Sequence, residues 1–264
     1  MKTTDFDPLD AKTSTGSRKA IDLREVWCRR GQRSVIQGVN FSVAGGETVA
    51  LIGPSGGGKS TLLRCLNGLT EFASGEISVC GRSLLPNGKT PFADLRYVRT
   101  SLGMIFQDYR LFPHKSVLAN VMEGPISVQG KSHDEARALA EGLIRRVGLA
   151  DFAGQSPGSL SGGQQQRVAI ARALAMKPTG LLCDEITAAL DPQLKGEVLG
   201  LLAQLREEGL TILMVTHEIG FARKSADRIV LLDGGKIIED GPPDQVLDHS
   251  NSARTREFLQ QVIG

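Results

Sequence analysis

Residues 53–61 read GPSGGGKST, a glycine-rich segment between an apolar run (residues 48–52) and a helix-forming run (residues 60–67). Glycines let successive backbone N–H groups converge on one point, and the following helix directs the positive end of its dipole to the same place. Strand, loop and helix in this order predict an α/β fold that binds phosphate at this loop.

The phosphate contacts are assigned to the loop and the start of its helix: Gly53, Pro54, Ser55, Gly56, Gly57, Gly58, Lys59, Ser60 and Thr61. Lys59 would reach the β- and γ-phosphates of a nucleotide, and the Ser60 hydroxyl would bind Mg²⁺. The alternative is a flexible glycine turn with a solvated Lys59. The order of strand, loop and helix favours the nucleotide site.

Composition excludes several classes of protein. With 264 residues and 41% hydrophobic residues, the chain can bury a sizeable core. Its 31 Lys and Arg nearly balance its 29 Asp and Glu, so no strong field would gather nucleic acid, and no nucleic-acid partner is expected. The four cysteines show no CxxC pair and no metal-like spacing, which favours reduced thiols over disulfides or zinc.

No targeting segment is expected. The first ten residues, MKTTDFDPLD, are acidic and polar, unlike a signal peptide. The longest apolar runs are far shorter than the roughly 18 residues that indicate a membrane span. We therefore expect a cytoplasmic chain whose contact with a membrane goes through another protein.

The chain has a strand-rich frame with a helical segment inside it. Residues 1–19 are predicted to be a flexible leader. Strands are predicted at residues 21–26, 48–52, 75–79, 102–106, 181–183, 211–215, 228–232 and 236–239. Continuous apolar runs among them are typical of parallel strands covered on both faces.

Residues 117–177 contain no convincing strand. Two helical stretches, residues 133–147 and 162–176, predict an inserted helical subdomain there. In residues 251–263, Phe258, Leu259 and Val262 predict a short amphipathic helix packed on the body.

A second candidate nucleotide element is LLCDE at residues 181–185, where an apolar strand delivers two carboxylates. Asp184 would hold Mg²⁺ through its water shell, and Glu185 would accept a proton from the water that attacks the γ-phosphate. Alone, two acids at this place are often only a solvated strand end. The loop at residues 53–61 favours the catalytic interpretation.

Residues 160–174 read LSGGQQQRVAIARAL and predict a helix that begins after Ser161. In isolation the start of this segment is a helix cap. The Ser161 hydroxyl and the amides of Gly162 and Gly163 also form a second phosphate-shaped cradle at a helix N-terminus.

From about residue 21 to the C-terminus, the sequence strongly resembles the ATP-binding cassette family. In that family residues 160–174 are the signature motif, and residues 181–185 are the second nucleotide-binding motif. Gln107 in GMIFQDYRLFPH resembles the glutamine loop, Asp191 in ALD ends the loop after the catalytic carboxylate, and His217 in MVTHE resembles the switch histidine.

The resemblance implies a P-loop NTPase fold: a mainly parallel core, an N-terminal antiparallel β subdomain and an inserted α-helical signature subdomain at about residues 108–177. The nucleotide-binding domain would span residues 20–250, with residues 251–264 as a helix packed on it. ATP and Mg²⁺ would be the ligands, and ATP would be hydrolysed to ADP and phosphate. Gln107 would contact Mg²⁺ and sense the attacking water, and Asp191 would belong to the nucleotide site.

The same resemblance implies a head-to-tail dimer, with itself or with a close paralogue. Ser161 and Gly163 of one subunit would complete the site that contains Lys59 of the other, and His217 would contact the γ-phosphate and steady the attacking water. Loss of the γ-phosphate charge on hydrolysis would weaken the contact and convert chemistry into motion.

In transporter members of the family, the segment at residues 108–123 docks a helix of the membrane subunit. Tyr109, Leu111, Phe112 and Val117 would supply apolar contacts there. The detailed sequences of the motifs resemble those of importers of polar amino acids. Two transmembrane permease subunits, an external solute-binding protein reached indirectly, and a place on the cytoplasmic face of the inner membrane are the implied context.

Two positions depart from the family pattern. Arg30 stands where an aromatic ring usually stacks on adenine, with Trp27 three residues earlier; either could stack, or Arg30 could be solvated and Trp27 buried. Ile186 stands where proline usually follows the catalytic carboxylate, and hydrolysis is expected to survive because Glu185 is intact. The alternatives left open are a soluble cassette ATPase acting on nucleic acid or in translation, and a regulatory nucleotide binder that does not hydrolyse.

Overall fold

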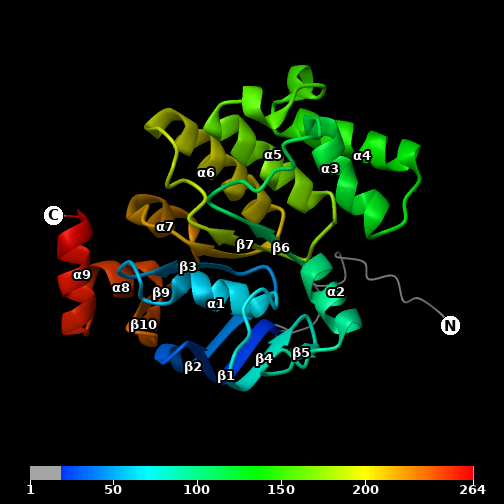
Figure 1. Ribbon diagram of the computed structural model, residues 1–264. Coiled ribbons are helices and arrows are strands. Elements are labelled where there is room, and N and C mark those ends of the chain that lie inside the picture. The colour runs from blue at the N-terminus through cyan, green and yellow to red at the C-terminus, as the bar shows by residue number, and fades with distance from the viewer. Residues whose placement is uncertain (1–18, 264) are drawn as a thin grey trace.

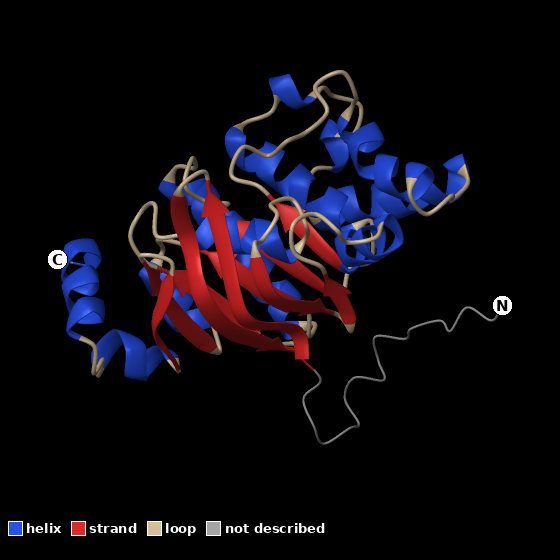
Figure 2. Cartoon of the chain, turned by 60° about the horizontal axis from the view of Figure 1, so that its bottom comes forward, coloured by secondary structure: helices blue, strands red, loops and turns tan. Residues whose placement is uncertain are grey.

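The computed structural model of the protein describes residues 19–263, which form two sheets and a set of helices (Figures 1 and 2). The predicted leader lies outside the described residues, apart from Lys19, and so does Gly264. Within the described part of the chain, no helix is long and apolar enough to cross a membrane.

The larger sheet has six strands in the order β10-β9-β3-β8-β7-β6. They are β3 (Thr48–Ile52), β6 (Leu102–Ile105), β7 (Gly180–Asp184), β8 (Thr211–Val215), β9 (Arg228–Asp233) and β10 (Lys236–Gly241). Neighbours are parallel except β10, which pairs antiparallel with β9. Every residue of β3, β7 and β8 is buried, which explains their unbroken apolar sequences and confirms the predicted parallel core.

The smaller sheet is antiparallel, in the order β2-β1-β4-β5. It contains β1 (Lys19–Arg30), β2 (Arg33–Ala44), β4 (Ser74–Val79) and β5 (Arg82–Leu84). The sequence did not predict β2 or β5. In β2 the alternation of apolar residues changes phase at Gly38, whose φ is +63°, because a bulge there shifts the pairing between Val39 and Ile36.

Three α-helices lie between β6 and β7, where two were predicted: α3 (Val117–Ser127), α4 (His133–Arg146) and α5 (Gly162–Leu174). Short 3-10 helices at Ala150–Phe152 and Pro157–Ser159 join α4 to α5. Helix α3 was missed because its second half contains Gly124 and Pro125, residues that usually end a helix. Ser116 caps its start by accepting a hydrogen bond from the Ala119 N–H.

The remaining helices are α1 (Lys59–Leu66), α2 (Phe92–Ser101), α6 (Pro192–Glu207), α7 (Ile219–Ser225), α8 (Pro243–Asp248) and α9 (Ala253–Ile263). Helix α9 stands at one end of the molecule, beyond α8 (Figure 1). Its Phe258 and Leu259 are buried as predicted, but Val262 is 40% exposed, so that part of the prediction was wrong.

The larger sheet divides the core into two clusters, because successive side chains of a strand point to opposite faces. Ala50 and Ile52 of β3 face the helices between β6 and β7. Val49 and Leu51 face α1 and the antiparallel sheet. Helix α1 therefore lies between the two sheets, and the loop that precedes it opens at the carboxyl edge of the parallel strands (Figure 1).

Candidate functional site

The loop between β3 and α1 has a backbone that needs its glycines. Gly53, Gly56 and Gly58 have φ values of +140°, +76° and +105°, which side chains disfavour. A Cβ on Gly53 would collide with the carbonyl oxygen of Leu232, and one on Gly58 would lie 2.8 Å from the Val35 carbonyl oxygen. The loop is therefore packed closely against β2 and β9, which fixes its shape.

Lys59 begins α1 and is 3% exposed. Its Nζ donates to the carbonyl oxygens of Gly53 (2.8 Å) and Pro54 (3.0 Å). Burial lowers the pKa of Lys59, while the nearby charges of Glu185 and Asp184 raise it. An ammonium has three donors, so one remains for an anion held over the loop.

Asp184, the last residue of β7, has one carboxylate oxygen paired and one unpaired. Oδ2 accepts a hydrogen bond from Arg64 of α1 at 3.2 Å. Oδ1 is buried and has no hydrogen-bond partner among the described residues. Ser60 and Asp184 line one cavity. An unpaired carboxylate oxygen and a hydroxyl residue around the same cavity fit the hard oxygen ligands that Mg²⁺ prefers, so these residues fit the predicted metal.

Glu185 follows β7 in a left-handed conformation, with a φ of +50°. Its N–H donates to Val215 of β8 (3.1 Å), and its Oε1 lies 3.3 Å from Nε2 of His217. The structure thus brings together the two residues predicted to act on the attacking water. The left-handed backbone costs about 1–2 kcal/mol, so tertiary contacts must hold it.

Ile186, the departure from the family pattern, has a structural role here. Its side chain is 5% exposed and packs in the core cluster with the helices. A proline at this position would push the preceding residue toward an extended backbone. Isoleucine therefore allows the left-handed conformation of Glu185.

Two adjoining cavities flank the loop and share Ser60 and Glu185. The first, about 420 Å³, is lined by Ser60, Arg64, Phe106, Gln107, Asp108, Tyr109, Arg110, Asp184, Glu185 and Ala189. The second, about 310 Å³, is lined by Arg30, Arg33, Val35, Ser55, Gly56, Gly58, Lys59, Ser60, Thr61 and Glu185. Lys59, Ser60, Gln107, Asp184 and Glu185 therefore lie around one pair of cavities, at the carboxyl ends of parallel strands, whereas Gly53, Pro54, Gly57 and His217 line neither cavity.

Arg30 lies in the wall of the second cavity, whereas Trp27 does not. Trp27 is 36% exposed and lies beside Gly38, so the alternative in which Trp27 is buried is wrong. Of the two residues considered for base stacking, the structure places Arg30 next to the phosphate loop.

The residues predicted to act across a dimer do not line either cavity of their own chain. Ser161 caps α5 in a capping box: its hydroxyl accepts from the Gln164 N–H, and its own N–H donates to Gln164 Oε1 at 2.8 Å. Gly162 and Gly163 form the first turn of the same helix. Asp191 caps α6 by accepting from the Leu194 N–H at 3.0 Å.

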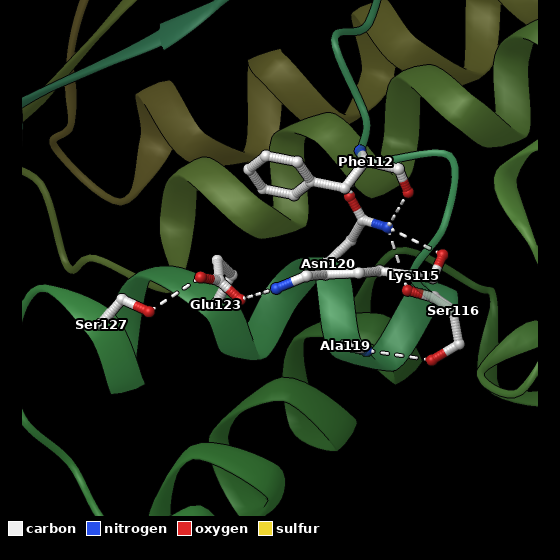
Figure 3. A network of polar contacts seen from close by, with 7 residues as sticks. All are labelled: Phe112, Lys115, Ser116, Ala119, Asn120, Glu123 and Ser127. Atoms are coloured by element: carbon white, nitrogen blue, oxygen red, sulfur yellow. Dashed lines mark hydrogen bonds and ion pairs between the residues drawn. The ribbon is translucent and has the colours of Figure 1, made fainter.

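The predicted docking segment is held by Asn120, a fully buried residue that sequence reasoning missed (Figure 3). Asn120 Nδ2 donates to the carbonyl oxygens of Phe112, Lys115 and Ser116, and Oδ1 accepts from the Phe112 N–H. Glu123 joins the network through Lys115 and Ser127. The side-chain amide of Asn120 therefore fixes the loop that leads into α3.

The surface of this segment differs from the predicted one. Phe112 is 39% exposed, as expected of a docking residue. Val117 is fully buried and offers no side chain to a partner, so the expectation for that residue was wrong. Leu111 is partly buried and packs against the core.

Arg64 was also missed by sequence reasoning. It lies one turn after Ser60 on α1, and this spacing places both side chains on the same face of the helix. That periodicity is the signal that would have found it.

Comparisons with known proteins agree with this geometry. Residues 36–188 match the family model described as ABC transporter. The chain is 49% identical over 242 residues to the glutamine transport ATP-binding protein of Escherichia coli (strain K12), covering 92% of this chain and 99% of that protein. It is 46% identical over 233 residues to the L-cystine import ATP-binding protein of Bacillus subtilis (strain 168), covering 88% of this chain and 94% of that protein. A solved ATP-binding cassette, in a dimeric post-hydrolysis state bound to ADP and Pi, is similar with a TM-score of 0.76 at 34% identity. That similarity covers 84% of this chain and 98% of the solved chain.

Proposed function

This chain belongs to the ABC transporter family. From that premise we propose that it is the ATP-hydrolysing subunit of an importer for a small polar solute, and the names of its relatives support an amino acid as that solute.

The observation that supports this most strongly is the meeting of Lys59, Asp184 and Glu185 around two adjoining cavities. Ammonium, free carboxylate oxygen and candidate base are the groups that hydrolysis of a nucleoside triphosphate needs.

Each residue has one task in the proposed reaction. Lys59 binds β- and γ-phosphate oxygens, and the loop amides around Gly56 and Gly58 surround them. Asp184 and Ser60 would hold Mg²⁺, which when bound would neutralise negative charge on the phosphates. Arg64 orients Asp184 by occupying its other carboxylate oxygen.

Glu185 orients the attacking water and accepts its proton. His217, 3.3 Å from the Glu185 carboxylate, keeps that carboxylate directed into the cavity and would contact the γ-phosphate. Gln107 faces the first cavity from the end of β6 and completes the set of polar groups around metal and water.

A second subunit completes the site in this proposal. Ser161, Gly162 and Gly163 lie outside the cavities of their own chain, at a helix start where the amide dipoles favour an anion. Similar solved cassettes are dimeric. We therefore assign this helix start to the nucleotide of the partner, with Asp191 near the same contact.

Purified protein tests the hydrolysis. Release of phosphate from Mg·ATP is measured for the wild type, for Glu185→Gln and for Glu257→Gln as a matched control on an exposed part of α9. We expect Glu185→Gln to lower kcat by 100-fold or more, on the order that a general base contributes, while Glu257→Gln matches the wild type. Nucleotide binding with a wild-type rate no higher than that of Glu185→Gln would refute hydrolysis and favour a regulatory binder.

The names of the relatives specify glutamine transport, L-cystine import and arginine transport, which supports an amino acid as the solute. We propose that two permease subunits dock at residues 108–123, with Phe112 as the exposed apolar contact. Uptake of labelled amino acids is measured in cells that lack this gene and carry either the wild type or Phe112→Glu. Loss of uptake with unchanged ATP turnover of the purified variant supports docking, and full uptake refutes it.

A further inference from the structure

The turn that follows Gln107 has an unusual backbone. Tyr109 and Arg110 are consecutive non-glycine residues with φ values of +57° and +49°. Such a pair persists only where other contacts hold it. The Arg110 N–H donates to the Asp108 carbonyl oxygen at 2.5 Å, and the Arg110 guanidinium lies 4.2 Å from the centre of the Phe106 ring.

Arg172 of α5 supplies the long-range contact. Its Nη2 donates to the Tyr109 carbonyl oxygen at 3.1 Å, and its Nη1 donates to the Arg110 carbonyl oxygen at 2.6 Å. Because the guanidinium is a planar fork, it can hold two successive carbonyls at once, which an ammonium cannot do in the same geometry.

Arg172 has no carboxylate within ion-pair distance in residues 19–263. It is half-buried, burial lowers its pKa, and its guanidinium lies 5.6 Å from the centre of the Phe112 ring. A cation withdrawn from water without a counter-ion is costly unless its donors are used. The two carbonyls of the turn are the groups that use them.

The same turn also contacts the other end of α5. A Cβ on Gly162 would lie 2.7 Å from the Tyr109 hydroxyl oxygen, so the Tyr109 side chain rests against the first residue of the helix. The main chain of the turn is thus bonded to Arg172 in the last turn of α5, and its side chain touches the residue after Ser161.

We propose that Arg172 is a positioning residue that ties the turn after Gln107 to helix α5, so that Gln107 and the helix start at Ser161 move as one unit. This inference rests on the proposed function, in which Gln107 and the helix start at Ser161 both act at a nucleotide site. A shift of Gln107 at the first cavity is passed through Asp108 to the turn at Tyr109 and Arg110. Because Arg172 holds the carbonyls of both turn residues, α5 follows that shift.

The test compares two identical substitutions on one helix. Arg172→Lys keeps the charge but loses the fork. Arg167→Lys is the matched control, because Arg167 also donates to a carbonyl, that of Val147 at 3.1 Å, and pairs with Glu197, away from the turn. Three quantities are measured for each variant: kcat and KM for Mg·ATP, hydrogen exchange of the amides at residues 109–112 without nucleotide, and the thermal midpoint as a check of folding.

We expect Arg172→Lys to lower kcat about tenfold with KM for ATP within twofold, since the loss of one charge-assisted hydrogen bond is on that scale. Exchange at residues 109–112 should become at least about tenfold faster, and Arg167→Lys should change neither. In a double-mutant cycle with Gln107→Ala, the double variant should be no slower than Gln107→Ala alone, because Arg172 acts through Gln107.

The inference is overturned if Arg172→Lys matches Arg167→Lys, if the losses multiply in the cycle, or if Gln107→Ala alone leaves kcat unchanged. Should Arg172→Lys fail to fold, Arg172→Gln replaces it with the same criteria. If the wild type does not hydrolyse ATP, the proposed function fails separately. Exchange at residues 109–112 then decides this inference: faster exchange in Arg172→Lys supports it, and unchanged exchange overturns it.

Discussion

Replacing Asn120 by alanine should destabilise the protein by an amount that the structure allows us to work out. Asn120 makes four side-chain hydrogen bonds in a fully buried position (Figure 3). Two of its acceptors keep another donor in the variant: the Phe112 carbonyl retains the Lys115 N–H, and the Ser116 carbonyl retains the N–H of residue 120. The Lys115 carbonyl and the Phe112 N–H lose the partners that the side chain gave them.

Leaving these two groups unpaired costs about 1–1.5 kcal/mol each, or about 2–3 kcal/mol together. Alanine is a better helix former than asparagine and returns about 0.6 kcal/mol within α3. The net loss is about 2 kcal/mol, which lowers the midpoint of thermal unfolding by about 4–8 °C in a domain of this size.

Urea unfolding followed by circular dichroism measures this loss. Asn120→Asp is the informative companion, because its carboxylate can still accept from the Phe112 N–H but presents negative charge to three carbonyl oxygens. It should be at least as unstable as Asn120→Ala at pH 7. Asn251→Ala, at an exposed position before α9, is the control. An Asn120→Asp protein as stable as the wild type would refute the role of the side-chain donor.

Three further predictions follow from single residues. Gly53→Ala should weaken ATP binding at least about tenfold in a fluorescent-nucleotide titration, because the added Cβ would collide with the Leu232 carbonyl oxygen. The control Gly200→Ala lies in open space on α6, so it should bind ATP normally, and its free energy of unfolding should be about 0.5–1 kcal/mol higher than that of the wild type. A hydrogen bond from Lys115 lowers the pKa of Glu123, so its stabilising effect is present at neutral pH and is lost as the pH falls through that lowered pKa. In urea unfolding, the free energy of unfolding of the wild type should exceed that of Glu123→Gln by about 0.5 kcal/mol at pH 7, and the difference should disappear once the pH lies below the lowered pKa of Glu123. Burial, with the nearby Asp184, raises the pKa of Cys183 to about 12, so Cys183 should stay unlabelled by iodoacetamide at pH 8 in the native protein, as peptide mass spectrometry can show.

Much of the fold could be predicted from sequence because it depends on local patterns. Strands β3, β7 and β8 are buried on both faces, and their unbroken apolar runs reveal them. Strand β2 was not predicted, because a bulge at Gly38 changes the phase of its alternating apolar and polar residues. Helix α3 was not predicted, because Pro125 lies inside it and proline is unfavourable in the interior of a helix.

The residues of the site could be predicted where they lie close together in the sequence, as at the phosphate loop. Contacts between segments that are far apart in the sequence could not be predicted. Asn120 and Arg172 look like ordinary helix residues in sequence, and only the folded chain shows that both hold carbonyls of the segment after Gln107. The backbone of Glu185 is likewise set by Val215 on a neighbouring strand.

We propose that ATP joins two copies of this chain through the helix start at Ser161. Sedimentation velocity of Glu185→Gln, with and without ATP, tests it most directly, because that variant is expected to bind ATP without consuming it. We expect Glu185→Gln to sediment as a monomer without ATP and as a dimer with ATP, and to lose the dimer when it is combined with Ser161→Glu, which places a negative charge at the exposed helix start. A protein that binds ATP and stays monomeric, or an ATP-dependent dimer that Ser161→Glu leaves unchanged, would contradict this proposal.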